Sequence, residues 1–183
     1  QAGNLGGGGF MMIYIASENR TIALDFRETA PSSASKNMFL DKDNNVDTNK
    51  SRFSLQSSGT PGTVHGLMQA LNKYGTLPRK KVIYPAYQLA KHGIKVTPYL
   101  HESLKRAYPR LSKHTYTKSI FYKNNKIPAI GDTLHQPDLA LTLIEIIRNG
   151  SNGFYTGRIA NLIDSFMKNN NGLITKNDLK NYQ

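Results

Sequence analysis

The stretch "NLGGGGFMMIYI" (Asn4–Ile15), followed shortly by "LDFRETAP" (Leu24–Pro31), decides how the N-terminal part of this chain folds. Its run "FMMIYIA" is continuously apolar and contains bulky and β-branched residues, which is typical of a strand covered on both faces. The polar stretch "SENR" interrupts the pattern, and "TIALDFR" then reads as a second strand. The sequence therefore predicts a β-hairpin of a central sheet within residues 1–28.

Charged residues gather at the end of the second strand. Because side chains alternate between the two faces of a strand, Asp25 and Arg27 are expected on the same face. An ion pair between them would hold the guanidinium in a fixed pose. The four glycines Gly6–Gly9 precede a strand rather than a helix, which is the wrong order for a phosphate-binding loop. Four residues without Cβ atoms instead allow another backbone or a ligand to come close.

The remaining residues, 29–183, are predicted to be mostly helical. Apolar residues recur at three-and-four spacing, with Thr60, Thr97 and Thr175 as predicted N-caps and glycines as stops. The segments expected to be helical are 60–75, 77–93, 97–111, 135–150, 157–172 and a last helix beginning at 175. A short helix is expected within 28–41, a surface loop over 41–53, and a hairpin or loop over 119–132.

Composition excludes several classes of protein and site. The 183 residues contain no cysteine, which excludes disulfides, thiolate nucleophiles and Cys-ligated zinc. The longest apolar run, Phe10–Ala16, is far shorter than the roughly 20 residues that a membrane helix needs. The chain begins with Gln1 and opens on a glycine-rich turn, which indicates a piece of a longer protein.

The net charge of +12 raises the question of a polyanionic partner. Lys and Arg occur in every segment, without an Arg-rich block or an aromatic stripe between basic residues. The charge is therefore interpreted as solvated surface, and no nucleic-acid or membrane partner is predicted. A basic module that binds nucleic acid or another polyanion stays open as the alternative.

No catalytic residue, metal site or cofactor site is predicted from the residues of this chain. The five histidines form no i, i+4 pair on a helix beside a carboxylate, and no serine lies in a G-x-S-x-G turn. Arg27 remains as a candidate. Two interpretations are open for it: a structural arginine paired with Asp25 or Glu28, or an anchor for a substrate carboxylate, for which the planar guanidinium is well suited.

Six motifs carry a resemblance to a known family. They are "GGGGFMMIY", "ALDFRETAP", "SGTPGTVHGLMQALNKYGTLP", "GDTLHQPDLALTL", "NGSNGFYTGRIA" and "NNGLITKNDLKNYQ". In this order they resemble the large-subunit segment of bacterial γ-glutamyltranspeptidase, from about Gly3 to Tyr182. The resemblance implies an α/β (α+β) protein, here one partial domain of the four-layer αββα sandwich of N-terminal-nucleophile hydrolases, with 1–28 as the hairpin and 29–183 as a mostly helical layer.

The resemblance also implies a function. In this family a precursor cleaves itself, and the new N-terminal threonine of the small subunit attacks the γ-amide of glutathione or a related donor. The γ-glutamyl group then passes to an amino acid, a peptide or water. The arginine of the family's RE-x-AP pattern, here Arg27, binds the α-carboxylate of the donor, and Asp25 and Glu28 are expected to orient it.

The resemblance further implies what this segment lacks. The small subunit with its nucleophile and the N-terminal part of the large subunit are absent from these residues, so the small subunit is an expected partner and the segment alone is expected to be inactive. Bacterial members are exported, which implies a periplasmic or secreted location. A non-catalytic homologue or a proteolytic fragment remains a further alternative.

Overall fold

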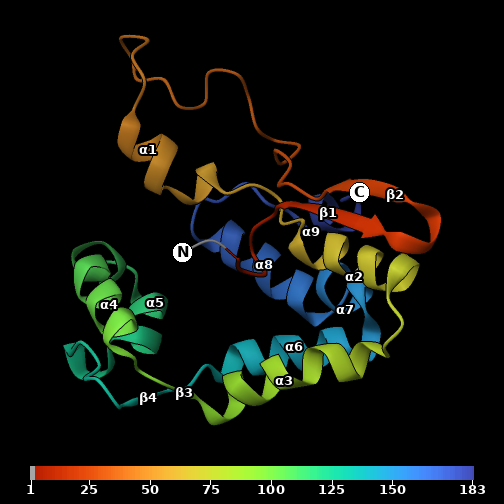
Figure 1. Cartoon of the computed structure of the whole chain (residues 1–183). Helices are drawn as coiled ribbons and strands as arrows, with labels where there is room; N and C mark the ends of the chain where they lie inside the picture. The colour runs from red at the N-terminus through yellow and green to blue at the C-terminus, as the bar shows by residue number, and fades with distance from the viewer. Residues whose placement is uncertain (1–2) are drawn as a thin grey trace. The chain divides into compact units, whose positions relative to one another are not determined.

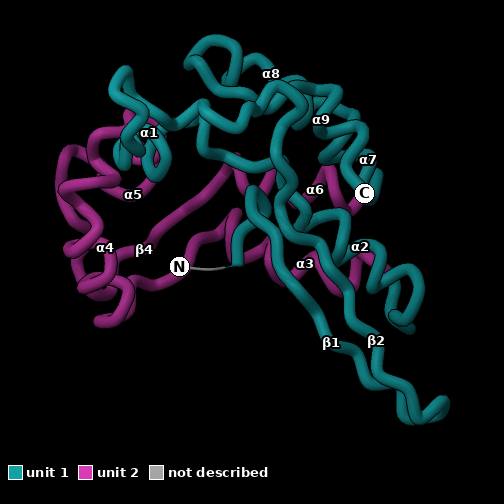
Figure 2. The backbone as a smooth tube through the Cα atoms, turned by 90° about the horizontal axis from the view of Figure 1, so that it is seen from above, with its two compact units in different colours: residues 1–78, 148–183 teal, residues 79–147 magenta. Residues whose placement is uncertain are grey.

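The structure is a computed structural model that describes residues 3–183, and it divides into two compact units (Figure 2). Unit 1 consists of the residues up to Pro78 together with Arg148–Gln183. Unit 2 consists of Arg79–Ile147. The labels of the elements follow Figure 1.

Unit 1 begins with the predicted hairpin, which is confirmed. Strands β1 (Phe10–Ile15) and β2 (Arg20–Asp25) pair antiparallel, with Phe10 opposite Asp25. The single 3-10 turn η1 (Ala16–Glu18) connects them, and Asn19 closes it in a left-handed conformation with φ 44°. Pairing continues past β2, because Gly9 and Phe26 exchange two backbone hydrogen bonds of 3.2 and 2.9 Å.

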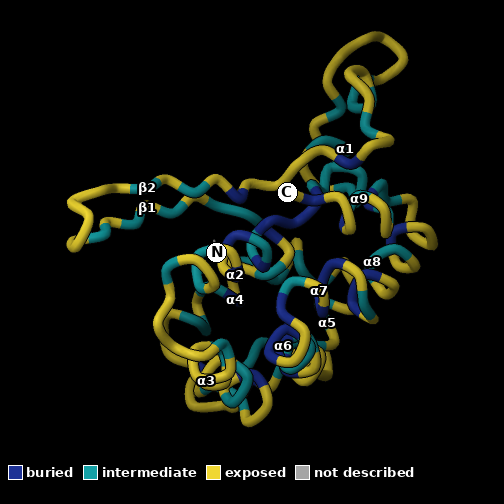
Figure 3. Tube along the Cα trace, turned by 90° about the vertical axis from the view of Figure 1, so that its right-hand side faces the viewer, coloured by how far each residue is buried: buried dark blue, intermediate teal, exposed yellow. Residues whose placement is uncertain are grey.

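The cover predicted for both faces of the first strand is not supplied by residues 3–183. Residues of β1 alternate between exposed and half-buried, and Phe10, Met12 and Tyr14 on one face are 66%, 70% and 62% exposed. Among the described residues β1 and β2 form a two-stranded sheet, and no other element covers the face that carries these three side chains (Figure 3). Apolar content alone does not reveal which partner covers a strand.

Four helices supply buried residues to the core of unit 1: α2 (Thr63–Tyr74), α7 (Ser151–Tyr155), α8 (Arg158–Asn169) and α9 (Lys176–Lys180). Two further short helices, α1 (Thr48–Phe53) and η2 (Leu55–Ser57), contain no buried residue. The buried side chains of the first four include Val64, Met68, Phe154, Ile159 and Leu179. The predicted cap Thr175 is confirmed, since α9 begins with a reciprocal capping box between Thr175 and Asp178.

Two local predictions in unit 1 are wrong. Residues 28–41 contain turns and isolated bridges instead of a short helix. The expected loop over 41–53 ends in helix α1, because the Asp47 side chain accepts a hydrogen bond of 2.9 Å from the backbone N–H of Lys50 and so caps it.

The start of α2 also differs from the prediction. The helix begins at Thr63 with Gly62 as its N-cap, so Thr60 is not the cap. The carbonyl of Gly7 instead accepts hydrogen bonds from the backbone N–H groups of Gly62 and Thr63, at 2.8 and 3.0 Å. A segment far upstream therefore supplies the acceptor that a capping side chain would supply.

Unit 2 is built on helix α3 (Arg79–His92) and most of helix α6 (Pro137–Asn149). Two hydrogen bonds at opposite ends show that they lie antiparallel: the Arg79 side chain donates to the carbonyl of Ile147 at 2.9 Å, and the Gln136 N–H donates to the carbonyl of Ala90 at 3.0 Å. The predicted stop at Gly93 is confirmed, since it follows α3 with φ 85°.

The rest of unit 2 comprises β3 (Ile94–Lys95), α4 (Pro98–Leu111), α5 (Thr115–Phe121), η3 (Lys123–Asn125) and β4 (Thr133–Leu134). Thr97 caps α4 as predicted. The expectation of a hairpin or loop over 119–132 is wrong for residues 119–121, which end helix α5. None of the helices in the described part of the chain is long and apolar enough to span a bilayer.

Candidate substrate-anchoring site

Arg27 lies two residues after the end of β2, and side chains bind both polar groups of its backbone. Its N–H donates to Asp25 Oδ1 at 2.9 Å, and its carbonyl accepts from the hydroxyl of Tyr182 at 2.7 Å. The expected ion pair between the Asp25 and Arg27 side chains does not occur among residues 3–183. The Asp25 carboxylate therefore binds the Arg27 backbone and not its guanidinium.

The glycine run explains how this backbone is fixed. A Cβ atom on Gly8 would lie 2.6 Å from the Phe26 carbonyl oxygen and 2.8 Å from Arg27 Cα, closer than carbon atoms tolerate. The predicted steric role of the glycines is thereby confirmed at Gly8, where the neighbour is the strand end that carries Arg27. The absence of a side chain allows the two segments to pack backbone against backbone.

A second segment joins the site from residues 57–60. Thr60 and Thr29 form an isolated antiparallel bridge, in which the Thr60 N–H donates to the Thr29 carbonyl at 2.8 Å. Thr60 is only 1% exposed. Next to it, a Cβ on Gly59 would lie 2.7 Å from Glu28 Cβ, so this loop also packs closely against the residues after Arg27.

An open cavity of about 490 Å³ lies between these two segments. Its lining residues are Gly6, Arg27, Glu28, Thr29, Ala30, Ser57, Ser58 and Gly59. The lining residues thus include one arginine and one glutamate, together with hydroxyl-bearing and small residues. Arg27 can donate two parallel hydrogen bonds to a carboxylate, whereas the negative charge of Glu28 opposes an anion.

Tyr182 supports the site as a neutral donor. Burial raises the pKa of its hydroxyl, and the nearby negative charges of Asp25 and Glu28 raise that pKa further. The hydroxyl therefore stays protonated at neutral pH and donates to the Arg27 carbonyl.

The histidines do not build a metal site in the described part of the chain, where no group of three or more His, Asp or Glu side chains comes together. His65 packs edge-on against Tyr155 and Tyr182 at ring-centroid distances of 6.2 and 5.5 Å. In unit 2, His101 Nδ1 lies 2.7 Å from the carbonyl oxygen of Pro128. Both rings have packing or backbone partners.

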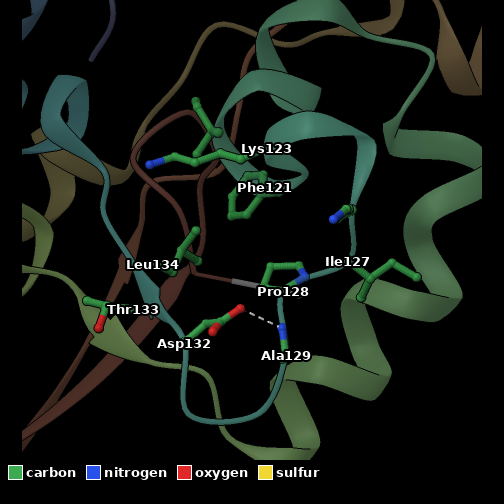
Figure 4. Close-up of a pocket in the computed structure, with 10 residues that line it drawn as sticks. Phe121, Lys123, Ile127, Pro128, Ala129, Asp132, Thr133 and Leu134 are labelled. Atoms are coloured by element: carbon green, nitrogen blue, oxygen red, sulfur yellow. Dashed lines mark hydrogen bonds between the residues drawn. The ribbon is translucent and has the colours of Figure 1, made fainter.

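Unit 2 contains a second cavity, of about 440 Å³ (Figure 4). Phe121, Pro128 and Leu134 contribute apolar surface to it. Its one carboxylate, Asp132, accepts a hydrogen bond of 2.8 Å from the backbone N–H of Ala129. Two cationic residues, Lys123 and Lys126, line this cavity as well.

Comparison with known proteins identifies the family. A family model described as Gamma-glutamyltranspeptidase matches residues 1–183. The chain belongs to the γ-glutamyltranspeptidase family. It is 49% identical over 184 residues to a glutathione hydrolase proenzyme of Escherichia coli, a match that covers 100% of this chain and 32% of that protein.

Solved structures agree with this membership. A γ-glutamyltranspeptidase of Helicobacter pylori matches with a TM-score of 0.96 and 45% identity, and one of Pseudomonas nitroreducens with 0.91 and 36%. Each match covers 100% of this chain and 52% of the solved chain. The α+β fold of a γ-glutamyltranspeptidase, an N-terminal-nucleophile hydrolase, is therefore confirmed for this segment, which spans about a third of the curated relatives that it matches.

Several residues of the candidate site were not singled out from the sequence. Ser57, Ser58 and Gly59 line the cavity, and Tyr182 binds the Arg27 carbonyl from 155 positions away. The motifs "SGTPGTV" and "LKNYQ" contain or adjoin most of them and pointed to the family, but nothing in their local pattern indicates contact with Arg27. Only the tertiary structure brings these segments together.

Proposed function

We propose that the full-length protein transfers γ-glutamyl groups from glutathione or other γ-glutamyl compounds to amino acids, peptides or water. In this proposal Arg27 binds the α-carboxylate of the donor, with Asp25 and Glu28 beside it. The observation that carries the proposal is the position of Arg27: its backbone is fixed on both sides, the residue lines an open cavity, and its guanidinium has no ion-pair partner among the described residues.

The remaining chemistry is assigned to a partner polypeptide. The proposal places the nucleophile, an N-terminal threonine, on a small subunit cut from the same precursor, in keeping with the name proenzyme of several relatives. The α-amine of such a threonine can act as its own base, and backbone N–H groups stabilise the oxyanion. Anchoring the donor carboxylate aligns the γ-carbonyl with that threonine, and correct alignment is worth roughly 7 kcal/mol or more.

Further parts of the proposal concern the segment and its location. We expect residues 1–183 alone to be inactive and to form part of one large-subunit domain, and we expect the whole protein to be periplasmic or secreted. Polyanion binding stays the alternative, and it predicts an affinity for DNA-cellulose that falls steeply with salt.

The test is to replace Arg27 in the full-length enzyme. Arg27→Ala should raise the donor KM by roughly 30- to 150-fold, because a charge-assisted hydrogen-bonded pair contributes about 2–3 kcal/mol. Arg27→Lys should recover little of this loss, since the forked geometry is gone. Autocleavage into subunits should continue, as seen on a denaturing gel.

A matched control lies on the same hairpin. Arg20 is an exposed arginine whose guanidinium binds Glu18 at 2.6 Å. Arg20→Ala should leave the donor KM within about twofold of the unmodified enzyme, since exposed ion pairs contribute little. A donor KM that stays unchanged in Arg27→Ala would rule out the proposed role of Arg27.

A further inference from the structure

Tyr182 binds the residue proposed to hold the donor, although it lies near the other end of the chain. Its hydroxyl donates to the Arg27 carbonyl at 2.7 Å, and the side chain as a whole is buried, with 7% of the residue exposed. The partner is the peptide group that directly follows the Arg27 Cα. A hydrogen bond at this place restricts rotation of the backbone from which the guanidinium projects.

The ring of Tyr182 is itself fixed by aromatic contacts. It stacks on Tyr155 with a centroid distance of 5.8 Å and an interplanar angle of 13°, and it meets His65 edge-on. Tyr155 is anchored in turn, because its hydroxyl donates to the Pro61 carbonyl at 2.8 Å and accepts from the His65 N–H at 3.1 Å. The hydroxyl of Tyr182 is thus presented on a rigid support built from α2, α7 and the residues after α9.

Helix α9 makes a second hydrogen bond to the segment that follows Arg27. Asp178, which completes the capping box of α9, accepts a hydrogen bond of 2.8 Å from the backbone N–H of Ser32. The chain between Arg27 and Ser32 is therefore held at both ends by α9 and the residue Tyr182 that follows it. This segment includes the cavity-lining residues Glu28, Thr29 and Ala30.

Close packing shows that this site accommodates a tyrosine with little spare room. A Cβ atom on Gly62 would collide with both the Tyr182 hydroxyl and the Phe26 carbonyl oxygen. The hydroxyl therefore occupies a slot bounded by the start of α2 on one side and by the strand end that carries Arg27 on the other.

We propose that Tyr182 is a positioning residue for donor binding: its hydroxyl fixes the peptide group of Arg27, so that the guanidinium is held in the orientation that accepts the donor α-carboxylate. This inference rests on the proposed role of Arg27 and extends it. A bidentate Arg–carboxylate pair depends on the orientation of both planes, so a freely turning Arg27 peptide weakens donor binding without removing any charge.

The test is Tyr182→Phe in the full-length, processed enzyme, which deletes one oxygen atom and retains the ring. We expect the donor KM to rise about three- to tenfold while kcat stays within about twofold, the pattern of lost positioning in the bound ground state. In an Arg27→Ala background the same substitution should change kcat/KM less than twofold, because the group that it positions is gone.

The control is Tyr122→Phe. Tyr122 is a buried tyrosine of unit 2, 1% exposed, whose hydroxyl donates to the Leu104 carbonyl at 2.8 Å, so it loses the same kind of bond without touching Arg27. We expect a comparable decrease of the melting temperature and an unchanged donor KM. If the Tyr182→Phe precursor is not cleaved into subunits at 37 °C, all three enzymes are produced and assayed at 20 °C, so that Tyr182→Phe can still be compared with Tyr122→Phe and the unmodified enzyme.

The outcomes separate the two proposals. If Arg27→Ala raises the donor KM and Tyr182→Phe does not, or if Tyr182→Phe lowers kcat/KM equally in both backgrounds, the positioning role is overturned and the anchoring role stands. If Arg27→Ala itself leaves the donor KM unchanged, the anchoring role fails, and with it the basis of this inference.

Discussion

The longest-range hydrogen bonds inside unit 1 join residues that lie farther apart in sequence than those inside unit 2. In unit 1, decisive hydrogen bonds join residues far apart in sequence: Tyr182 and Arg27 are separated by 155 positions, and Asp178 and Ser32 by 146. In unit 2, the bonds of Tyr122 to Leu104 and of His101 to Pro128 span 18 and 27 positions, and the bond of Arg79 to Ile147 at the two ends of the unit spans 68. The candidate site lies where long-range contacts converge, so that the Arg27 backbone is fixed by several elements at once.

The largest expected difference concerns glycines. In unit 1, Gly62→Ala would place a Cβ against the Phe26 carbonyl and the Tyr182 hydroxyl, neither of which can move without breaking other contacts. We expect a loss of at least about 3 kcal/mol of stability, the upper end for overpacking in a core. Melting of the full-length enzyme and its yield of processed subunits measure this effect.

The matched glycine in unit 2 is Gly131, which has φ 90° and open space where a Cβ would lie. Gly131→Ala should cost only about 1–2 kcal/mol, from the left-handed conformation alone. Equal losses for the two substitutions would contradict the view that unit 1 depends on close backbone packing.

The same contrast explains which features the sequence predicts. The N-caps Thr97 and Thr175 follow from residues within one helical turn, so local pattern finds them. The start of α2 was misplaced because its acceptor, the Gly7 carbonyl, lies more than fifty positions upstream. The exposure of one face of β1 was missed for a related reason, since burial of a strand depends on partners outside the local sequence.

The candidate site was predictable to a smaller extent. Arg27 stood out through the resemblance of "FRETAP" to a family motif, while residue chemistry alone left a structural role open. The expected Asp25–Arg27 ion pair followed from strand alternation, yet the Asp25 carboxylate turns to the Arg27 backbone N–H, a short-range bond that alternation does not describe. The local sequence does not reveal Ser58 and Tyr182, because Ser58 lines the same cavity as Arg27 and Tyr182 binds the Arg27 carbonyl only in the folded chain.

A smaller difference is expected between the two helix caps. Thr175 exchanges hydrogen bonds with Asp178: its Oγ1 accepts from the Asp178 N–H at 3.2 Å and donates to Asp178 Oδ2 at 2.6 Å. Thr97 accepts only from the Leu100 N–H, at 3.2 Å. We expect Thr175→Ala to cost about 1–2 kcal/mol and Thr97→Ala about 0.5–1 kcal/mol.

Regional hydrogen exchange of the full-length enzyme measures each loss in its own helix, since local opening reports local stability. Thr175→Ala should speed exchange in α9, and Thr97→Ala should speed it in α4 to a lesser degree. If exchange increases more in α4 than in α9, the second hydrogen bond of the capping box does not stabilise α9 beyond what a single N-cap bond provides.

The smallest expected effect is a dependence on pH that arises from Asp178. Burial acts to raise the pKa of this carboxyl, but hydrogen bonds from Thr175 and Ser32 outweigh it and hold the pKa below its ordinary value. A carboxyl whose pKa is lower in the folded state stabilises the protein at pH values above its pKa in the unfolded state, which is near 3.9. This contribution is lost as the pH falls toward the pKa of the folded state.

The stability difference between the unmodified enzyme and Asp178→Asn should therefore be constant from pH 7 to about pH 5 and shrink between about pH 4 and pH 3. Hydrogen exchange in α9 across this pH range measures the stability difference, with Thr97→Ala as a control that removes no titrating group. A difference that stays constant down to pH 3 would show that the charge of Asp178 does not stabilise α9 and the segment that contains Arg27.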